Sequence, residues 1–273
     1  MNAPYDGIDF HRPTQTSKDA EYMLQALNAR RVAGGGPFTL RAEKLLQELT
    51  GSKRVLLTTS CTHALEMAAL LFDIQPGDEV ILPSFTFTST ANAFALRGAK
   101  IVFADSRADT LNLDEKEVER LASKRTKVIV PVHYAGIACE MDAINAVAKT
   151  TGAKVLEDNA HGLFGAYKGK PLGSLGAMAT QSFHESKNIT CGEGGALAFN
   201  DTSYLARAEI IREKGTNRSA FFRGEVDKYT WVDVGSSFVI SDLLAAYLTA
   251  QLEGAATAQA HRKQAFDRYM SEL

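Results

Sequence analysis

The sequence predicts an α/β fold in which a mostly parallel sheet lies between layers of helices. Two observations carry this prediction: short apolar runs alternate with helical patterns along the chain, and polar residues follow directly after several of these runs. Alternation of this kind favours parallel strands joined by helices. Ligands of such sheets bind beyond the carboxyl ends of the strands, so residues that follow a strand are candidate site residues.

The expected strands cover residues 54–58, 79–82, 100–103, 127–132 and 153–157, and the expected helices cover 62–72, 89–97, 114–122 and 141–150. The stretch before Phe38 is looser, with a glycine-rich loop at 33–37. Helical spacing resumes at Ser241 and runs to the last residue, with an interruption at Gly254. We therefore expect an N-terminal arm and loop (1–40), a large domain (41–240) and a C-terminal helical segment (241–273).

Composition narrows the class of protein. The 273 residues suffice for a sizeable core, and 45% hydrophobic with 23% charged residues is typical of a globular chain. A formal net charge of −2 favours neither nucleic acid nor an anionic membrane as a partner. Three scattered cysteines and six histidines provide neither a disulfide framework nor metal-ligand spacing. Without a signal sequence or an apolar spanning run, a soluble cytoplasmic protein without a metal site is expected.

The most informative segment is 182–195, where Lys187 lies among small and hydroxyl residues and precedes a glycine-rich turn at 191–195. Most lysines are exposed and inert. A lysine buried beside a ligand, however, can lose its proton near neutral pH, which imine formation and proton transfer both require. This pattern indicates imine formation with pyridoxal 5′-phosphate (PLP), a cofactor that also needs an acidic partner and a phosphate site.

A phosphate site is predicted where the strand 54–58 leads into the next helix. Ser60 and Thr62 offer hydroxyl groups there, and free backbone N–H groups together with the helix dipole attract anions. Serine and threonine are equally ordinary helix N-caps, so this segment alone does not distinguish the two roles.

Three further residues follow strands. Asp158 comes directly after the strand 153–157, where its carboxylate could keep a pyridine nitrogen protonated, although an isolated aspartate is more often a cap or turn residue. His161 could bind the ring hydroxyl of the cofactor, or it could be structural. Phe87 is preferred over Phe85 as a ring-stacking aromatic, although such aromatics usually belong to the core.

The order and spelling of these motifs resemble the DegT/StrS-type sugar-nucleotide aminotransferases, which have the type I PLP-dependent aminotransferase fold. The resemblance covers nearly the whole chain. It is greatest to the branch that makes dTDP-4-amino-4,6-dideoxygalactose for bacterial surface polysaccharides. The matching stretches are residues 66–78, 89–94, 130–136, 211–218 and 228–237.

The resemblance implies a role for each matching residue. Lys187 would carry PLP, and Asp158 would pair with the ring nitrogen; both would be catalytic. His161 stands where relatives usually have glutamine near the ring hydroxyl. The ring would stack on Phe87. The phosphate would be held by Ser60, Cys61 (through its backbone), Thr62 and Ser182.

Two departures from the family bear on its partners. Relatives commonly carry Gly-x-Asn after the Trp-containing loop, and that asparagine reaches the phosphate of the neighbouring subunit. Here residues 235–237 read Gly-Ser-Ser, which makes Ser237 the candidate substitute in a homodimer with shared active sites. The family also continues for a smaller domain of order 100 residues, which would begin where this sequence stops. A truncated, catalytically impaired PLP-binding fragment is therefore an alternative.

The resemblance implies a transamination in two half-reactions. Glutamate would donate the amino group, and a 4-keto-6-deoxy sugar nucleotide, dTDP-4-dehydro-6-deoxyglucose, would receive it. Lys214, Arg218 and Arg223 are candidates for the diphosphate, although a solvated loop explains them nearly as well. Relatives that remove a sugar hydroxyl instead have histidine in place of the lysine, so Lys187 argues against that reaction.

Overall fold

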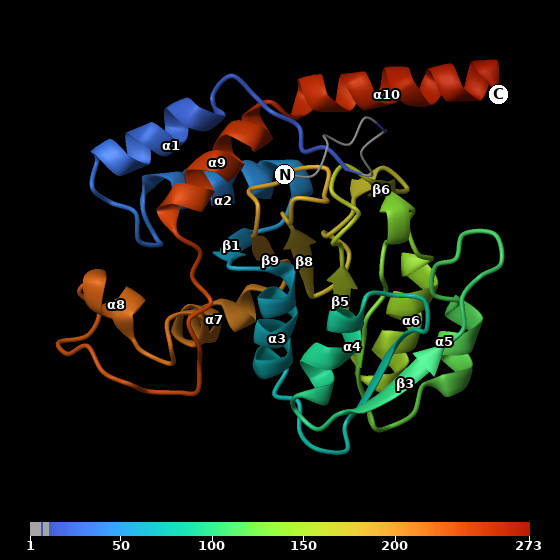
Figure 1. Cartoon of the computed structure of the whole chain (residues 1–273). Helices are drawn as coiled ribbons and strands as arrows, with labels where there is room; N and C mark the ends of the chain where they lie inside the picture. The colour runs from blue at the N-terminus through green and yellow to red at the C-terminus, as the bar shows by residue number, and fades with distance from the viewer. Residues whose placement is uncertain (1–6, 8–10) are drawn as a thin grey trace.

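The computed structural model describes residue 7 and residues 11–273, so most of the first ten residues of the expected N-terminal arm lie outside the described part. Figure 1 shows the arrangement of the elements. In chain order they are α1 (Asp19–Asn28), α2 (Pro37–Thr50), β1 (Arg54–Thr58), α3 (Cys61–Leu71), β2 (Glu79–Pro83), α4 (Thr88–Ala95), β3 (Lys100–Ala104), α5 (Glu115–Leu121), β4 (Thr126–Ile129), η1 (Tyr134–Gly136), α6 (Met141–Thr151), β5 (Lys154–Asp158), β6 (Ala166–Tyr167), β7 (Lys170–Pro171), β8 (Met178–Ser182), β9 (Gly195–Phe199), η2 (Thr202–Tyr204), α7 (Leu205–Arg212), α8 (Arg218–Phe222), α9 (Asp242–Glu253) and α10 (Ala255–Glu272).

The main sheet of the described chain has seven strands in the order β1-β9-β8-β5-β4-β2-β3. Strand β9 runs antiparallel to both of its neighbours, and the remaining pairs, β8–β5, β5–β4, β4–β2 and β2–β3, are parallel. The carboxyl ends of β1, β2, β5 and β8 therefore share one edge with the start of β9. The predicted fold class, an α/β fold with a mostly parallel sheet, is confirmed.

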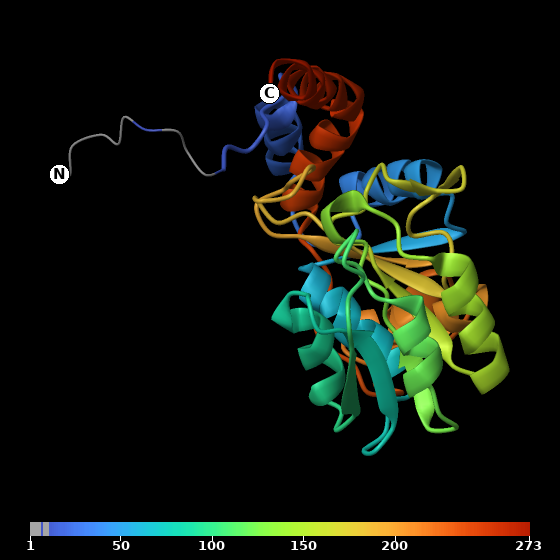
Figure 2. The ribbon, with the colours of Figure 1, turned by 90° about the vertical axis from the view of Figure 1, so that its right-hand side faces the viewer.

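Helices cover both faces of this sheet, which explains the apolar runs of the sequence. Along β2, Val80 and Leu82 pack with α3 and α4, whereas Ile81 packs on the opposite face with α5 and α6. Helices α2 and α9 cover that second face over β1, β8 and β9. Figures 1 and 2 both place α1, α2, α9 and α10 at one end of the molecule. The sheet thus forms the middle of three layers.

Local chemistry sets several element boundaries. Pro37 occupies the first turn of α2, where its missing N–H costs nothing, so the glycine loop ends one residue earlier than expected. Ser241 caps α9 by accepting from the backbone of Leu244, as the predicted helix start requires. The strand expected at 127–132 ends at Ile129, because Pro131 has no N–H to continue the ladder. Val132 regains pairing as a single bridge to Asp158.

Candidate active site

One cavity of about 410 Å³ lies at the shared strand edge. It brings together the last residues of β5 and β8, the first turns of α3 and α4, and residues from the segments that follow β2, β4, β5 and β8. Eight residues predicted from the sequence line it: Ser60, Cys61, Thr62, Phe87, Asp158, His161, Ser182 and Lys187.

Asp158 lies at the end of β5, and its side chain is buried. Its Oδ2 accepts a hydrogen bond from the Thr90 hydroxyl at 2.7 Å, and its Oδ1 accepts from the backbone N–H of Ala160 at 3.2 Å. The backbone of Asp158 is fixed as well, because its N–H donates to Pro131 and its carbonyl accepts from His133. The carboxylate is therefore held in a single orientation beside the cavity.

Lys187 lies in the loop that joins β8 to β9. Backbone bonds from Phe183 to Gly194 and from Cys191 to Phe183 close the base of this loop, at 2.8 and 3.0 Å. The Lys187 amide then donates to the carbonyl of His184 at 2.9 Å. Burial lowers the pKa of the half-buried Lys187 amine, with nearby Cys61 and Asp158 acting in the opposite direction. A lowered pKa raises the fraction of neutral, nucleophilic amine.

The start of α3 supplies hydroxyl groups and unpaired backbone donors. The Ser60 side chain caps the helix by accepting from the N–H of His63 at 3.0 Å, and Thr62 shares a hydrogen bond with Ser89 at 2.8 Å. Gly195 approaches this turn closely: a Cβ atom there would lie 2.3 Å from the backbone nitrogen of Cys61. The glycine-rich segment thus lets β9 pack against the helix start, which is suited to an anion.

An aromatic wall borders the cavity beside Asp158. The ring of Tyr134 contacts His161 edge-on at 4.7 Å between centroids and contacts Phe85 at 4.6 Å. The His161 Nδ1 atom accepts from the backbone N–H of Ala135 at 3.3 Å. Burial, then the positive charge of Lys187, lowers the pKa of His161. Phe87 is 72% exposed, so one face of its ring is available to a ligand.

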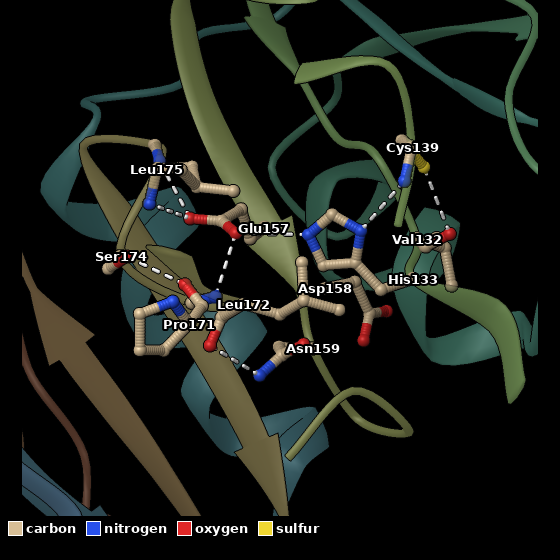
Figure 3. Close-up of polar contacts among 12 residues, drawn as sticks. Val132, His133, Cys139, Glu157, Asp158, Asn159, Pro171, Leu172, Ser174 and Leu175 are labelled. Atoms are coloured by element: carbon tan, nitrogen blue, oxygen red, sulfur yellow. Dashed lines mark hydrogen bonds and ion pairs between the residues drawn. The ribbon is translucent and has the colours of Figure 1, made fainter. Parts of the chain in front are cut away.

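Behind Asp158 lies a buried pair that sequence reasoning missed, His133 and Glu157 (Figure 3). Their side chains meet at 3.0 Å between Nε2 and Oε2. The Glu157 carboxylate also accepts from the backbone N–H groups of Gly173, Leu175 and Gly176 at 2.6–2.8 Å. Glu157 and Asp158 are consecutive on β5, so they point to opposite faces of the sheet. The pair fixes the loops around the site from the far side.

The structure does not bring four of the predicted residues to the cavity. Ser237 is exposed, and its backbone forms an isolated antiparallel β-bridge with Glu213. Lys214 is exposed and pairs with Glu213 at 3.3 Å. The remaining two cations also pair with carboxylates of their own region. Arg218 lies 4.0 Å from Glu213, and Arg223 binds Glu209 and Glu225 at 2.9 and 2.6 Å.

Sequence reasoning also missed the side chains that support the site, Thr90, Ser89 and Tyr134. Ser89 and Thr90 lie in the first turn of α4, after β2, and Tyr134 lies after β4, so all three belong to segments that follow strands of the sheet. What the sequence lacked was the pairing of β4 with β5 that brings Tyr134 beside His161.

Comparison with known proteins decides the family. The model of the DegT/DnrJ/EryC1/StrS aminotransferase family matches residues 13–273. The chain belongs to this family. It is 37% identical to the spore coat polysaccharide biosynthesis protein SpsC of Bacillus subtilis, over 86% of this chain and 61% of that protein. It is 34% identical to the GDP-perosamine synthase of Caulobacter vibrioides, over 97% of this chain and 70% of that protein.

Solved structures agree with this assignment. Spr1654 from Streptococcus pneumoniae, in its PMP form, superposes with a TM-score of 0.91 at 28% identity, over 97% of this chain and 72% of that one. The same protein was also solved in PLP and apo forms. The chain spans 61–62% of the length of the first two curated relatives, SpsC and the Methanocaldococcus jannaschii protein MJ1066.

No group of three or more His, Cys, Asp or Glu side chains in the described part of the chain is arranged to hold a metal ion. No helix within residues 11–273 combines the length and the apolar character that crossing a membrane requires.

Proposed function

We propose that this chain binds PLP and transfers an amino group between an amino acid and a keto sugar carried on a nucleotide. The observation that carries the proposal is that Lys187, from the loop between β8 and β9, and Asp158, at the end of β5, line one cavity together with the hydroxyl-rich start of α3. Membership of an aminotransferase family supports it, as do PLP and PMP forms of a structural neighbour.

The residues present fit the cofactor. The buried Asp158 carboxylate suits a protonated ring nitrogen. A buried charge is costly by itself, and a hydrogen-bonded group of opposite charge offsets that cost. The N-terminus of α3 suits the phosphate, with hydroxyl donors from Ser60, Thr62 and Ser182 and the backbone N–H of Cys61. Phe87 offers an aromatic face, and His161 offers a ring nitrogen to the cofactor's hydroxyl.

Lys187 and Asp158 have separate roles in the proposed mechanism. When bound, PLP supplies an electron sink that stabilises negative charge on the carbon next to the transferred nitrogen. Burial lowers the pKa of the Lys187 amine, which favours its neutral form, and its Nζ atom would take up and give back the proton of that carbon. Asp158 holds the positive charge that makes the sink effective.

For the substrates, we propose glutamate as donor and dTDP-4-dehydro-6-deoxyglucose as acceptor, giving the 4-amino-4,6-dideoxygalactose product. The stretches at 66–78 and 228–237 support this branch of the family, and a GDP-perosamine synthase among the relatives supports a nucleotide sugar. Lys214, Arg218 and Arg223 are proposed for the diphosphate; each would have to leave its present carboxylate partner. We also propose a cytoplasmic homodimer in which Ser237 serves the partner's phosphate site.

The test of the cofactor proposal is borohydride reduction of PLP-loaded protein followed by peptide mass mapping. We expect a yellow protein whose reduced cofactor stays attached to the peptide that contains Lys187, and Lys187→Ala should lose both colour and attachment. Lys168→Ala is the matched control, since Lys168 is exposed and pairs with Asp142 away from the cavity. Attachment at another lysine, or a colourless wild-type complex, contradicts the proposal.

The alternative to transamination is PLP binding without turnover. The two half-reactions distinguish it from transamination. Under the first proposal, glutamate converts bound PLP to the amino form, and keto sugar nucleotide then restores the original absorbance. Cofactor that binds at Lys187 yet responds to neither substrate identifies the second.

A further inference from the structure

The buried pair of His133 and Glu157 has a defined proton arrangement. The Nδ1 atom of His133 accepts from the backbone N–H of Cys139 at 3.2 Å, so it carries no proton. The single ring proton of the neutral imidazole then lies on Nε2, which donates to Glu157 Oε2 at 3.0 Å. Glu157 accepts at every one of these contacts, because its three other partners are backbone N–H groups. Figure 3 shows these bonds converging on the pair.

This pair anchors the start of the loop 133–139, which carries Tyr134 and Ala135. Asn112 holds the same loop from the other side: its Oδ1 accepts from the Tyr134 N–H at 3.1 Å, and its Nδ2 donates to the Ile137 carbonyl at 2.7 Å. Ala135 adopts φ = 53°, in the left-handed region that residues with a Cβ atom disfavour. The anchors, not the intrinsic preference of the backbone, therefore impose this conformation.

The loop 133–139 contacts His161 through the backbone of Ala135. The Ala135 N–H, aimed by the strained turn, donates to His161 Nδ1 at 3.3 Å. A backbone N–H has no acceptor role, so the neutral His161 ring must carry its proton on Nε2. Because His161 lines the cavity and its Nδ1 atom is occupied, Nε2–H is the polar group left for a ligand.

We propose that Glu157 and His133 are positioning residues that select the Nε2–H tautomer of His161, so that the cavity presents a hydrogen-bond donor at this point. Glu157 fixes His133, His133 fixes the loop 133–139, and this loop fixes the direction of the Ala135 N–H. That this donor meets the cofactor's ring oxygen rests on the proposed function. The tautomer itself does not, since it follows from groups of the chain alone.

The experiment is long-range proton–nitrogen NMR on the whole chain labelled with 15N-histidine, without added PLP, at pH 7.5. Such spectra distinguish a protonated ring nitrogen from an unprotonated one and so identify the tautomer. The His161→Gln and His133→Asn variants assign the two sets of signals. In the wild-type protein we expect the Nε2–H pattern for both rings.

In Glu157→Gln, we expect the two ring-nitrogen signals of His161 to move toward each other, because the ring now averages over both tautomers. His133→Asn should have the same effect, since its amide oxygen still accepts from Cys139 but does not reach Glu157. Glu43→Gln is the matched control: Glu43 is equally buried but bonds Arg54, Arg212 and the backbone of Leu57 instead. It should leave the signals of His161 unchanged.

A wild-type His161 with its proton on Nδ1, or doubly protonated, overturns the proposal even if neither variant folds. Unchanged His161 signals in a folded Glu157→Gln or His133→Asn protein overturn the positioning role. If the tautomer is as expected and PLP nevertheless does not attach at Lys187, the proposed function fails and this inference stands.

Discussion

The carboxylate of Asp158 is oriented before any ligand arrives. Thr90 holds one oxygen and the Ala160 amide holds the other, while backbone bonds fix the strand end beneath them. Preorganised groups of this kind need no rearrangement when charge develops nearby, which is where most electrostatic catalysis originates. The hydroxyl of Thr90 is therefore as much a part of the proposed site as the residues that would touch the cofactor.

Thr90→Val removes that hydroxyl while it keeps the shape of the side chain. We expect the free energy of unfolding to fall by about 2 kcal/mol, since hydrogen bonds to charged groups are the stronger kind, and PLP to bind more weakly. Urea titration and PLP titration measure the two effects. Thr249→Val is the control, because that hydroxyl bonds only to backbone carbonyls away from the cavity, those of Ala245 and Phe38; it should cost about 1 kcal/mol and leave PLP binding unchanged.

His161 should remain neutral through the physiological pH range. Its pKa lies below the ordinary 6.5 because of burial and the charge of Lys187, with Asp158 opposing. Below pH 6.5 the unfolded chain then binds more protons than the folded one, so stability falls as the pH drops toward the folded-state pKa. Unfolding of the wild-type protein and of His161→Gln, compared between pH 7.5 and 5, measures this. If the two proteins lost stability in parallel as the pH falls, the lowered pKa of His161 would be contradicted.

Strand β9 explains why glycine is needed beside the reactive loop. It lies between β1 and β8 and runs antiparallel to both. Its first residue, Gly195, packs on the turn between β1 and α3. Any side chain there meets backbone atoms of Ser60 and Cys61, which have no room to move aside. One residue thus couples the lysine loop to the proposed phosphate site.

Gly195→Ala should therefore damage both stability and cofactor binding. We expect a loss of about 3 kcal/mol in the free energy of unfolding, at the upper end of overpacking effects, and weaker retention of PLP on dialysis. Gly152→Ala is the control: Gly152 has φ = 79° but open space around a Cβ atom, so only the backbone cost of about 1 kcal/mol applies. Equal effects of the two substitutions would exclude the close approach as the cause.

The strands that sequence analysis found are rich in branched aliphatic residues, and in 79–82 these residues are buried on both faces of the sheet. Strands β8 and β9 went unpredicted because they read Met-Ala-Thr-Gln-Ser and Gly-Ala-Leu-Ala-Phe, with small and polar residues in buried positions. Tertiary packing decides such segments. Helix α1 likewise lies where a loose arm was expected. Its buried residues, Tyr22 and Ala26, pack against α9, a contact between distant segments that the local sequence does not reveal.

The candidate site was more predictable than these elements. Asp158 and His161 were predicted from their place at the end of a strand, and Lys187 from the small residues and the glycine-rich turn near it, which are local signals; Cys61 and Ser182 were predicted only from the family resemblance. The supporting pair of His133 and Glu157 was not predictable, because its members are 24 positions apart and meet only once β4 and β5 pair. Buried polar pairs of this type leave no pattern in a single sequence.

At the scale of the whole molecule, an apolar surface marks the segment 221–234. Trp231 is 72% and Phe222 71% exposed, and Val232 and Val234 are exposed beside them. Ser237, which the family pattern links to a neighbouring subunit, follows this segment and lies away from the cavity of its own chain. Large apolar side chains that a segment leaves exposed can be covered by a partner, and we propose that a second copy of the chain covers these.

Mixing two damaged chains tests whether the sites are shared. Lys187→Ala and Ser237→Trp should each be inactive alone, and their mixture should recover about a quarter of the wild-type rate, because half of the dimers then hold one intact site of two. Sedimentation of each variant checks that dimers form. Full activity of Ser237→Trp on its own would show that each chain supplies its own phosphate site.

The closed base of the loop between β8 and β9 limits how this protein can diverge. Both flanking strands lie in the interior of the sheet, so neither end of the loop can slide along its neighbours to accommodate a changed length. An inserted or deleted residue between 183 and 194 would have to be absorbed next to Lys187 itself. Natural variants should therefore differ here by replacement and vary in length elsewhere.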